Sequence, residues 1–276
     1  MRDERRIRAL YRQHRRRTRK NAQSVNFGNW IRTRIVLAFL LASLICIGLS
    51  AVIPILLIRI VLWMVAGVML AIFAYLTYVY YQFSEKGGGV QRRLWTLVID
   101  HLHWDHRGKI LDIGTGNGPL AILLAAKYPD AQLTGTDYWG KAWEYSQQMC
   151  EQNAAAMGVA QRTHFQKASA SNLPFAEGAF DAAISHFVFH EVADAPDKRN
   201  VIREALRVIR KGGAFAFQDM FLDKELYDDR DALLGAIHSW GVEEVYFVET
   251  GKILNLPRLL RHPRVLGKAA LIYGRK

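Results

Sequence analysis

The chain has 276 residues, a formal net charge of +12 at neutral pH and 51% hydrophobic residues. This length allows one sizeable domain and an additional module. Its two cysteines, Cys46 and Cys150, give neither a disulfide framework nor a metal-ligand spacing. The charge is uneven, because residues 1–34 hold twelve arginines and lysines against two acidic residues. The rest of the chain is close to neutral, so the overall basicity says nothing about its substrate.

Two long apolar stretches follow the basic segment. Residues 35–58 and 60–84 contain no charged residue, and only Arg59 separates them. Each stretch exceeds the roughly 20 residues that cross a bilayer as a helix. A cleaved signal peptide does not fit, because the basic and apolar runs are too long and a second span follows.

These stretches predict a transmembrane helical hairpin over residues 35–83, with helices at about 35–56 and 60–82. Arg59 would then lie at the far interface. A single long kinked helix and a monotopic hairpin are the alternatives. Gly87-Gly88-Gly89 follows as a flexible linker, or as a hinge for the next amphipathic helix.

The basic tail of residues 1–34 is expected to keep the N-terminus in the cytoplasm and to attract anionic lipid. Nucleic-acid binding is the less favoured interpretation of its arginine runs. Two spans return the chain to its starting side. The domain predicted over residues 84–276 should therefore also be cytoplasmic.

The most informative motif is ILDIGTGNGPLA, residues 110–121. An apolar run ends at Asp112, three glycines alternate over residues 114–118, and a helix-like pattern follows. A strand, a glycine turn and a helix in this order form a binding site for a nucleotide-like ligand. The glycines let the ligand approach the backbone closely, and the first turn of the helix offers free N–H groups. Dinucleotide enzymes use G-x-G-x-x-G instead. The G-x-G-x-G spacing and the acid before it suit a ligand with a cationic amino acid moiety.

This motif resembles motif I of the class I methyltransferases that bind S-adenosylmethionine. Asp137 ends the next predicted strand, 25 residues after Asp112, where an acid can accept hydrogen bonds from both ribose hydroxyls. The alternative is that Asp137 caps a helix over residues 143–157. Tyr138 and Trp139 could pack on the adenine or in the core.

Later segments extend the resemblance. Leu173-Pro174-Phe175 and Phe180-Asp181-Ala182 resemble the family's LPF and FD signature. Within the family, the chain is similar to the branch that contains the ubiquinone and menaquinone C-methyltransferases and many small-molecule methyltransferases. Ser169 is a departure, because the family has an acid there that reads the adenine amino group. A hydroxyl forms a weaker hydrogen bond than a carboxylate.

A helix is predicted between Pro196 and Gly212, and Gly212-Gly213 should then turn into a strand over residues 214–217. Strand-like runs over residues 243–248 and 269–273 resemble the antiparallel hairpin that closes the family's sheet. The resemblance therefore implies an α/β fold, a Rossmann-like seven-stranded sheet that is mostly parallel with an antiparallel last strand.

S-adenosylmethionine is the implied cofactor, and no metal site is expected. Its predicted binding residues are Asp112, Gly114, Thr115, Gly116, Gly118, Asp137, Tyr138, Ser169, Ala170 and Ser185.

Three residues after the fourth predicted strand are candidates for a general base: His190 first, then His186 and Glu191. An unperturbed histidine titrates near pH 6.5 and can accept a proton at neutral pH. The alternative is that His190 and Glu191 begin and cap a helix. A second histidine cluster, His101, His103 and His106, is expected to be a surface or capping feature.

The expected function is a membrane-anchored methyltransferase that acts on a small, lipophilic or membrane-associated acceptor. A non-catalytic S-adenosylmethionine-binding sensor or scaffold is the alternative, motivated by Ser169. A nicotinamide-dependent oxidoreductase is disfavoured by the glycine spacing. The acceptor atom and the oligomeric state are not specified by the sequence.

Overall fold

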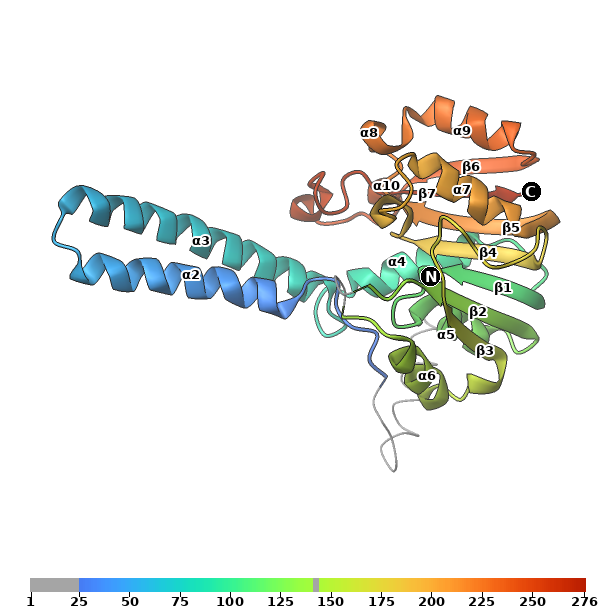
Figure 1. Cartoon of the computed structure of the whole chain (residues 1–276), viewed down its shortest axis with the longest axis horizontal. Helices are drawn as coiled ribbons and strands as arrows, with labels where there is room; N and C mark the ends of the chain where they lie inside the picture. The colour runs from blue at the N-terminus through green and yellow to red at the C-terminus, as the bar shows by residue number, and fades with distance from the viewer. Residues whose placement is uncertain (1–24, 141–143) are drawn as a thin grey trace. The chain divides into compact units, whose positions relative to one another are not determined.

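The computed structural model describes residues 25–140 and 144–276, so residues 1–24 of the basic tail and residues 141–143, where the helix predicted over residues 143–157 would begin, lie outside the description (Figure 1). The described residues form two compact units. One is Asn29–Arg93, and the other is Leu94–Lys276 joined by residues 25–28.

The first unit is an antiparallel pair of helices, α2 (Thr33–Val52) and α3 (Leu56–Phe83). Ser43 Oγ donates a hydrogen bond to the carbonyl of Ala66 at 3.0 Å. Small residues at such a crossing allow close backbone approach, and the hydroxyl adds a polar contact between apolar helices. Both helices are long and apolar enough to cross a membrane.

The limits of the two helices correct the prediction. The first helix ends at Val52 instead of residue 56, because Ile53 precedes Pro54 and is extended, as residues before proline prefer. The second helix starts at Leu56, so Arg59 lies within its first turn and not between the helices. Large apolar side chains of both helices are exposed, including Leu41 at 59% and Leu57 at 71%.

The second unit is built on a seven-stranded sheet, counted over the described residues, with strand order β3-β2-β1-β4-β5-β7-β6. β7 is antiparallel to β5 and β6, and the other neighbouring strands are parallel. This confirms the predicted fold. The strands are β1 (Gly108–Ile113), β2 (Ala131–Asp137), β3 (Thr163–Lys167), β4 (Phe180–His186), β5 (Ile209–Asp219), β6 (Glu244–Glu249) and β7 (Ala270–Arg275).

Helices cover both faces of this sheet (Figure 1). Side chains along β1 alternate between the two faces, and those on both faces are apolar. Ile110 joins the core on one face, while Leu111 and Ile113 join the core on the other, so each face needs a cover of helices. The first face carries α4 (Val90–His101), α5 (Pro119–Lys127) and α6 (Gln147–Ala156), and the second carries α7 (Lys198–Arg207) and α9 (Arg230–Ser239). Short elements complete the unit: η2 (Ala160–Arg162), η3 (Phe189–Glu191), α8 (Lys224–Tyr227), α10 (Thr250–Ile253) and η4 (Arg258–Arg261).

The predicted helix between Pro196 and Gly212 is too long. α7 begins at Lys198 after the cap Asp197 and ends at Arg207. β5 starts at Ile209, so Gly212 and its neighbour lie within the strand. The strand is irregular there, because the register of β4 and β5 shifts and Gly212 has a φ of +68°.

Candidate functional site

Four parallel strands end at one edge of the sheet: β1 at Ile113, β2 at Asp137, β4 at His186 and β5 at Asp219. The chain order reverses between β1 and β4, since β1 continues to β2 on one side and β4 to β5 on the other. Ligands of open α/β sheets bind at the carboxyl edge beside such a point. The predicted cofactor residues and the predicted base candidates therefore meet at one edge.

The glycine loop between β1 and α5 requires glycine. Gly114, Gly116 and Gly118 have φ values of +71°, +58° and +82°, which only glycine adopts without strain. A Cβ on Gly114 would also lie 2.1 Å from a methyl group of Val188. The loop thus exposes backbone where side chains would block close approach.

Asp112 is buried beneath this loop. Its Oδ2 accepts hydrogen bonds from Thr115 Oγ1 at 2.7 Å and from the N–H of Ala121 in α5 at 3.2 Å. Burial raises the pKa of Asp112 to about 7, against the lowering effect of these two hydrogen bonds. Asp112 therefore joins the strand, the loop and the helix, and it titrates in the neutral range. Its contact with the cofactor stays a prediction.

Asp137 holds the same loop from β2. Its Oδ2 accepts from the N–H of Gly116 and its Oδ1 from the N–H of Trp139, both at 2.8 Å. The interpretation as a helix cap is wrong, because α6 starts at Gln147 and Ser146 caps it. The carboxylate lies at the loop, where the ribose role was predicted.

The two aromatic residues after Asp137 differ. Trp139 packs against the core, and its Nε1 donates to the carbonyl of Gly116 at 2.9 Å. Tyr138 is 64% exposed, and Lys167 Nζ lies 4.9 Å from the centre of its ring. Tyr138 is thus the one of the pair with a face open to a ligand.

Ser169 acquires a carboxylate partner through the fold. The hydroxyls of Ser169 and Ser171 donate to Oδ2 of Asp194 at 2.9 and 2.8 Å. The hydrogen bond from Ser171, followed by that from Ser169, lowers the pKa of Asp194. An ionised acid therefore stands beside the position where the family has one, but from a segment that sequence reasoning did not connect with it.

Two further predicted cofactor residues have structural partners. Ser185 is buried, and its Oγ donates to the carbonyl of Ile113 at 3.0 Å, which joins β4 to β1. Ala170 is buried in the core. Their contacts with the cofactor stay predictions.

Sequence reasoning also missed a link from the segment before the hairpin. The N–H of Asn26 donates to Asn153 Oδ1 at 2.8 Å, and Asn153 Nδ2 donates to the carbonyls of Asn26 and Asn117 at 2.9 and 3.0 Å. Asn117 lies in the glycine loop. The segment over residues 25–28 is therefore attached to the back of this loop.

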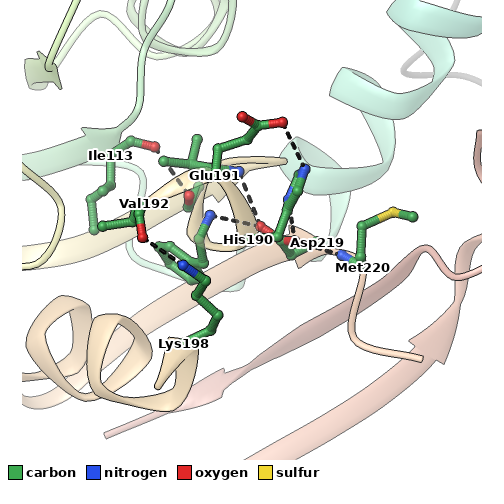
Figure 2. Close-up of polar contacts among 10 residues, drawn as sticks. Ile113, His190, Glu191, Val192, Lys198, Asp219 and Met220 are labelled. Carbon is green, nitrogen blue, oxygen red and sulfur yellow. Dashed lines mark hydrogen bonds and ion pairs between the residues drawn. The ribbon is translucent and has the colours of Figure 1, made fainter. Parts of the chain in front are cut away.

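On the other side of the edge, His190 pairs with Asp219 (Figure 2). The Nδ1–Oδ1 distance is 2.7 Å, and Asp219 is fully buried. Asp219 also accepts from the backbone N–H groups of Val188, Phe189 and Met220. This carboxylate thus fixes η3 and the orientation of the imidazole together.

The pKa of His190 changes what this ring can do. Burial alone would lower the pKa, but the carboxylate of Asp219, helped by Glu191, raises it to about 10. This pKa favours the imidazolium at neutral pH, a form that donates a proton and does not accept one. The general-base role of His190 stays a prediction, and the pKa speaks against it. Asp219 was missed, although an acid at the end of a strand was the signal that identified Asp112 and Asp137.

The other two base candidates fit the role poorly. Burial lowers the pKa of His186 to about 3, so its ring is neutral and a weak base. Glu191 is half-exposed, and its Oε1 lies 3.5 Å from His190 Nε2. The histidines before β1 serve packing, since His101 and His103 lie edge-on to the ring of Tyr273. Within residues 25–140 and 144–276, no group of three metal-ligating side chains comes together.

Comparison with known proteins gives consistent results. Residues 110–213 match the family model described as a methyltransferase domain. The chain is 30% identical over 145 residues to a ubiquinone/menaquinone biosynthesis C-methyltransferase of Geotalea daltonii, covering 50% of this chain and 59% of that protein. It is 31% identical to a demethylmenaquinone methyltransferase of Thermotoga maritima, covering 41% and 43%.

The chain spans about half the length of these curated relatives. Among solved structures, geranyl diphosphate C-methyltransferase from Streptomyces coelicolor superposes with a TM-score of 0.50 at 12% identity. That alignment covers 67% of this chain and 80% of the other. At this identity the likeness concerns the fold alone.

Proposed function

Since the domain that contains residues 110–213 belongs to the class I S-adenosylmethionine-dependent methyltransferases, we propose that the protein is a membrane-anchored methyltransferase with a small, lipophilic acceptor. The observation that carries this proposal is the arrangement at one sheet edge. A glycine loop with strand-end acids stands on one side, and an imidazolium with a buried counter-ion stands on the other.

The residues present fit the cofactor of this family. The glycine loop presents backbone without Cβ atoms, and the carboxylate of Asp137 lies against it at 2.8 Å. When bound, S-adenosylmethionine supplies a methyl group that its sulfonium already activates. The chain's task is to align the acceptor and exclude water.

Each cofactor residue then has a distinct role. Asp137 would bind the ribose, and Asp112 would balance the positive charge of the methionine portion. Tyr138 and the Ser169–Asp194 pair would contact the adenine, with the carboxylate of Asp194 acting through the serine hydroxyl or directly. These roles follow from strand-end position and partners.

His190 would act on the acceptor as a cation. Its Nδ1 is held by Asp219, and Nε2, which lies 3.5 Å from Glu191 Oε1, is the ring nitrogen that would donate to an acceptor oxygen in place of that carboxylate. A positively charged hydrogen-bond donor in a fixed position stabilises the negative charge that develops on an oxygen atom during the reaction. This favours an acceptor with an acidic hydroxyl group, such as a phenol, and the names of the two curated relatives, which concern quinone biosynthesis, agree with that class.

The hairpin supports a membrane location. Its helices are long and apolar, and most of their large side chains are exposed. Asn29 Nδ2 donates to the carbonyl of Tyr80 at 3.1 Å, so the start of α2 and the end of α3 lie together. If both helices span the membrane, the basic sequence before α2 favours a cytoplasmic location for the tail and the catalytic domain.

Incubation of the full chain in native membranes with methyl-deuterated S-adenosylmethionine tests the proposal. Mass spectrometry should find the label in a lipid-extractable compound, and Asp137→Ala should abolish it. Label confined to water-soluble compounds would contradict the lipophilic acceptor. Cofactor binding without any labelled product across membrane extracts would favour the alternative, a sensor or scaffold, which the absence of an acid at Ser169 motivates.

A further inference from the structure

The connection between β6 and β7 is longer than the fold requires. Glu249 and Ala270 are paired in the antiparallel ladder, so a tight turn could join the two strands. Instead Thr250–Ala269 intervenes, drawn in red in Figure 1 and containing α10 and η4. We call this segment the β6–β7 insertion. Its length needs an explanation other than closing the sheet.

The charged residues of the β6–β7 insertion are all basic. The insertion contains no aspartate or glutamate, and its five basic residues are Lys252, Arg258, Arg261, Arg264 and Lys268. Two large apolar side chains on it are exposed, Ile253 at 48% and Leu259 at 55%. Exposed apolar side chains among cations are typical of segments that lie at a membrane surface.

The insertion is an ordered part of the domain and not a loose loop. Its side chains Leu256, Leu260 and Leu266 are buried. Arg261 Nε donates to the carbonyl of Leu256 at 2.8 Å, which holds η4 from within. The outward side chains of Arg258 and Leu259 are therefore presented by a fixed backbone.

Two of the cations have carboxylate partners and two do not. Lys268 pairs with Asp223 and Lys252 with Glu249, both at 2.7 Å. Arg258 and Arg264 are exposed, and no carboxylate of residues 25–140 or 144–276 forms an ion pair with them. Their charge is open to an external anion.

The position of the insertion connects it with the site. β6 runs parallel to the central strands, so the insertion begins at the carboxyl edge where the site lies. Ala270, where it ends, pairs with Asp219 in β5. At its start, Thr250 Oγ1 accepts a hydrogen bond from Gln218 Nε2 at 2.8 Å. Its two ends therefore lie beside the carboxylate that holds His190.

We propose that the β6–β7 insertion is a membrane-contact surface that binds anionic phospholipid headgroups through Arg258 and Arg264 and seats Leu259 and Ile253 in the interface. This rests on the proposed membrane attachment, because the hairpin keeps the domain near a bilayer and raises the effective concentration of that surface. Contact would bring the acceptor side of the site to the level where a lipophilic acceptor resides. An acidic soluble partner would use the arginines but leave the two apolar side chains in water.

The test uses the full chain with Cys46→Ser, reconstituted in nanodiscs with and without anionic phosphatidylglycerol. Cys150 is retained because it is buried. An environment-sensitive fluorophore is attached at Leu259→Cys, at Asp130→Cys on the opposite edge, or at Met64→Cys in α3. Brominated lipids then quench fluorophores that reach the bilayer.

We expect quenching at position 259 in anionic discs, no quenching at position 130, and quenching at position 64 in all discs. Arg258→Glu with Arg264→Glu should remove the quenching at position 259. The matched control Arg107→Glu, an exposed arginine at the amino edge, should not. Higher salt should weaken the contact, because exposed charges are screened.

The outcomes separate the two proposals. Quenching at position 64 without quenching at position 259 would overturn the membrane-contact surface and leave the hairpin intact. Quenching at position 259 without quenching at position 64 would support the surface and overturn the spanning hairpin. Loss of quenching at both positions would overturn both. Quenching at position 259 that is equal in neutral discs would overturn the role of anionic headgroups.

Discussion

The imidazole of His190 and the carboxylate of Asp219 lie 2.7 Å apart, with Asp219 completely buried at the end of β5. The same carboxylate receives three backbone N–H groups, two of them from the segment that begins η3. That segment also packs against the glycine loop, since Val188 lies beside Gly114. One buried acid thus connects His190 and the segment of η3 with the glycine loop.

Asp219→Asn should therefore destabilise the domain strongly. The amide would turn N–H donors towards backbone N–H groups and leave the imidazolium with only the half-exposed Glu191 as a counter-ion. Breaking a buried ion pair by removing one partner costs about 3–5 kcal/mol. Thermal unfolding of the full chain in detergent measures this as a large drop in Tm. Asp130→Asn, in an exposed loop, is the control and should leave Tm unchanged. A loss below about 1 kcal/mol would show that the carboxylate is not needed in ionised form.

Stability should also fall at alkaline pH. The pKa of His190 is raised in the folded chain to about 10 from an ordinary value of 6.5. The stabilisation from this shift is complete below pH 6.5 and is lost as the pH rises through about 10. His190→Gln should flatten the dependence of Tm on pH between these values. An unchanged slope in the variant would assign the alkaline loss to other groups.

Cofactor affinity should increase with pH in the neutral range. Asp112 has a pKa raised to about 7, and a cationic ligand favours its ionised form. Ionisation between pH 6 and 8 should tighten binding by about tenfold, with proton release on binding. Calorimetry in buffers of different ionisation enthalpy measures both effects. Asp112→Asn should bind more weakly and without this pH dependence, whereas a tight, pH-independent wild type would contradict the prediction.

Asp194 should contribute to cofactor binding although it lies outside the family's motif. Asp194→Ala removes the acceptor of the Ser169 and Ser171 hydroxyls and the carboxylate that the proposed adenine contact uses. We expect at least about a tenfold loss of affinity in calorimetry. Asp228→Asn, which affects only an exposed pair with Arg199, should bind as the wild type does. Equal affinity of both variants would place Asp194 outside the site.

The sequence by itself determined the fold and the position of the glycine loop within it. ILDIGTGNGPLA specifies a strand, a left-handed glycine turn and a helix through local backbone constraints, and Asp137 ends a strand whose pattern is equally local. The two apolar stretches specify helices by composition. Composition does not specify the limits of these helices, because the turn depends on how the chain accommodates Pro54 and the extended residue before it.

Only the tertiary structure decided which groups act together. Asp194 meets Ser169 across 25 residues of sequence, and Asp219 meets His190 across 29. Such pairs form because parallel strands bring their carboxyl ends to one edge, and no local pattern encodes which side chains meet there. The protonation state of His190 could not be predicted from the sequence for the same reason. Its pKa is set by burial and by a carboxylate from another strand, and both are properties of the folded chain.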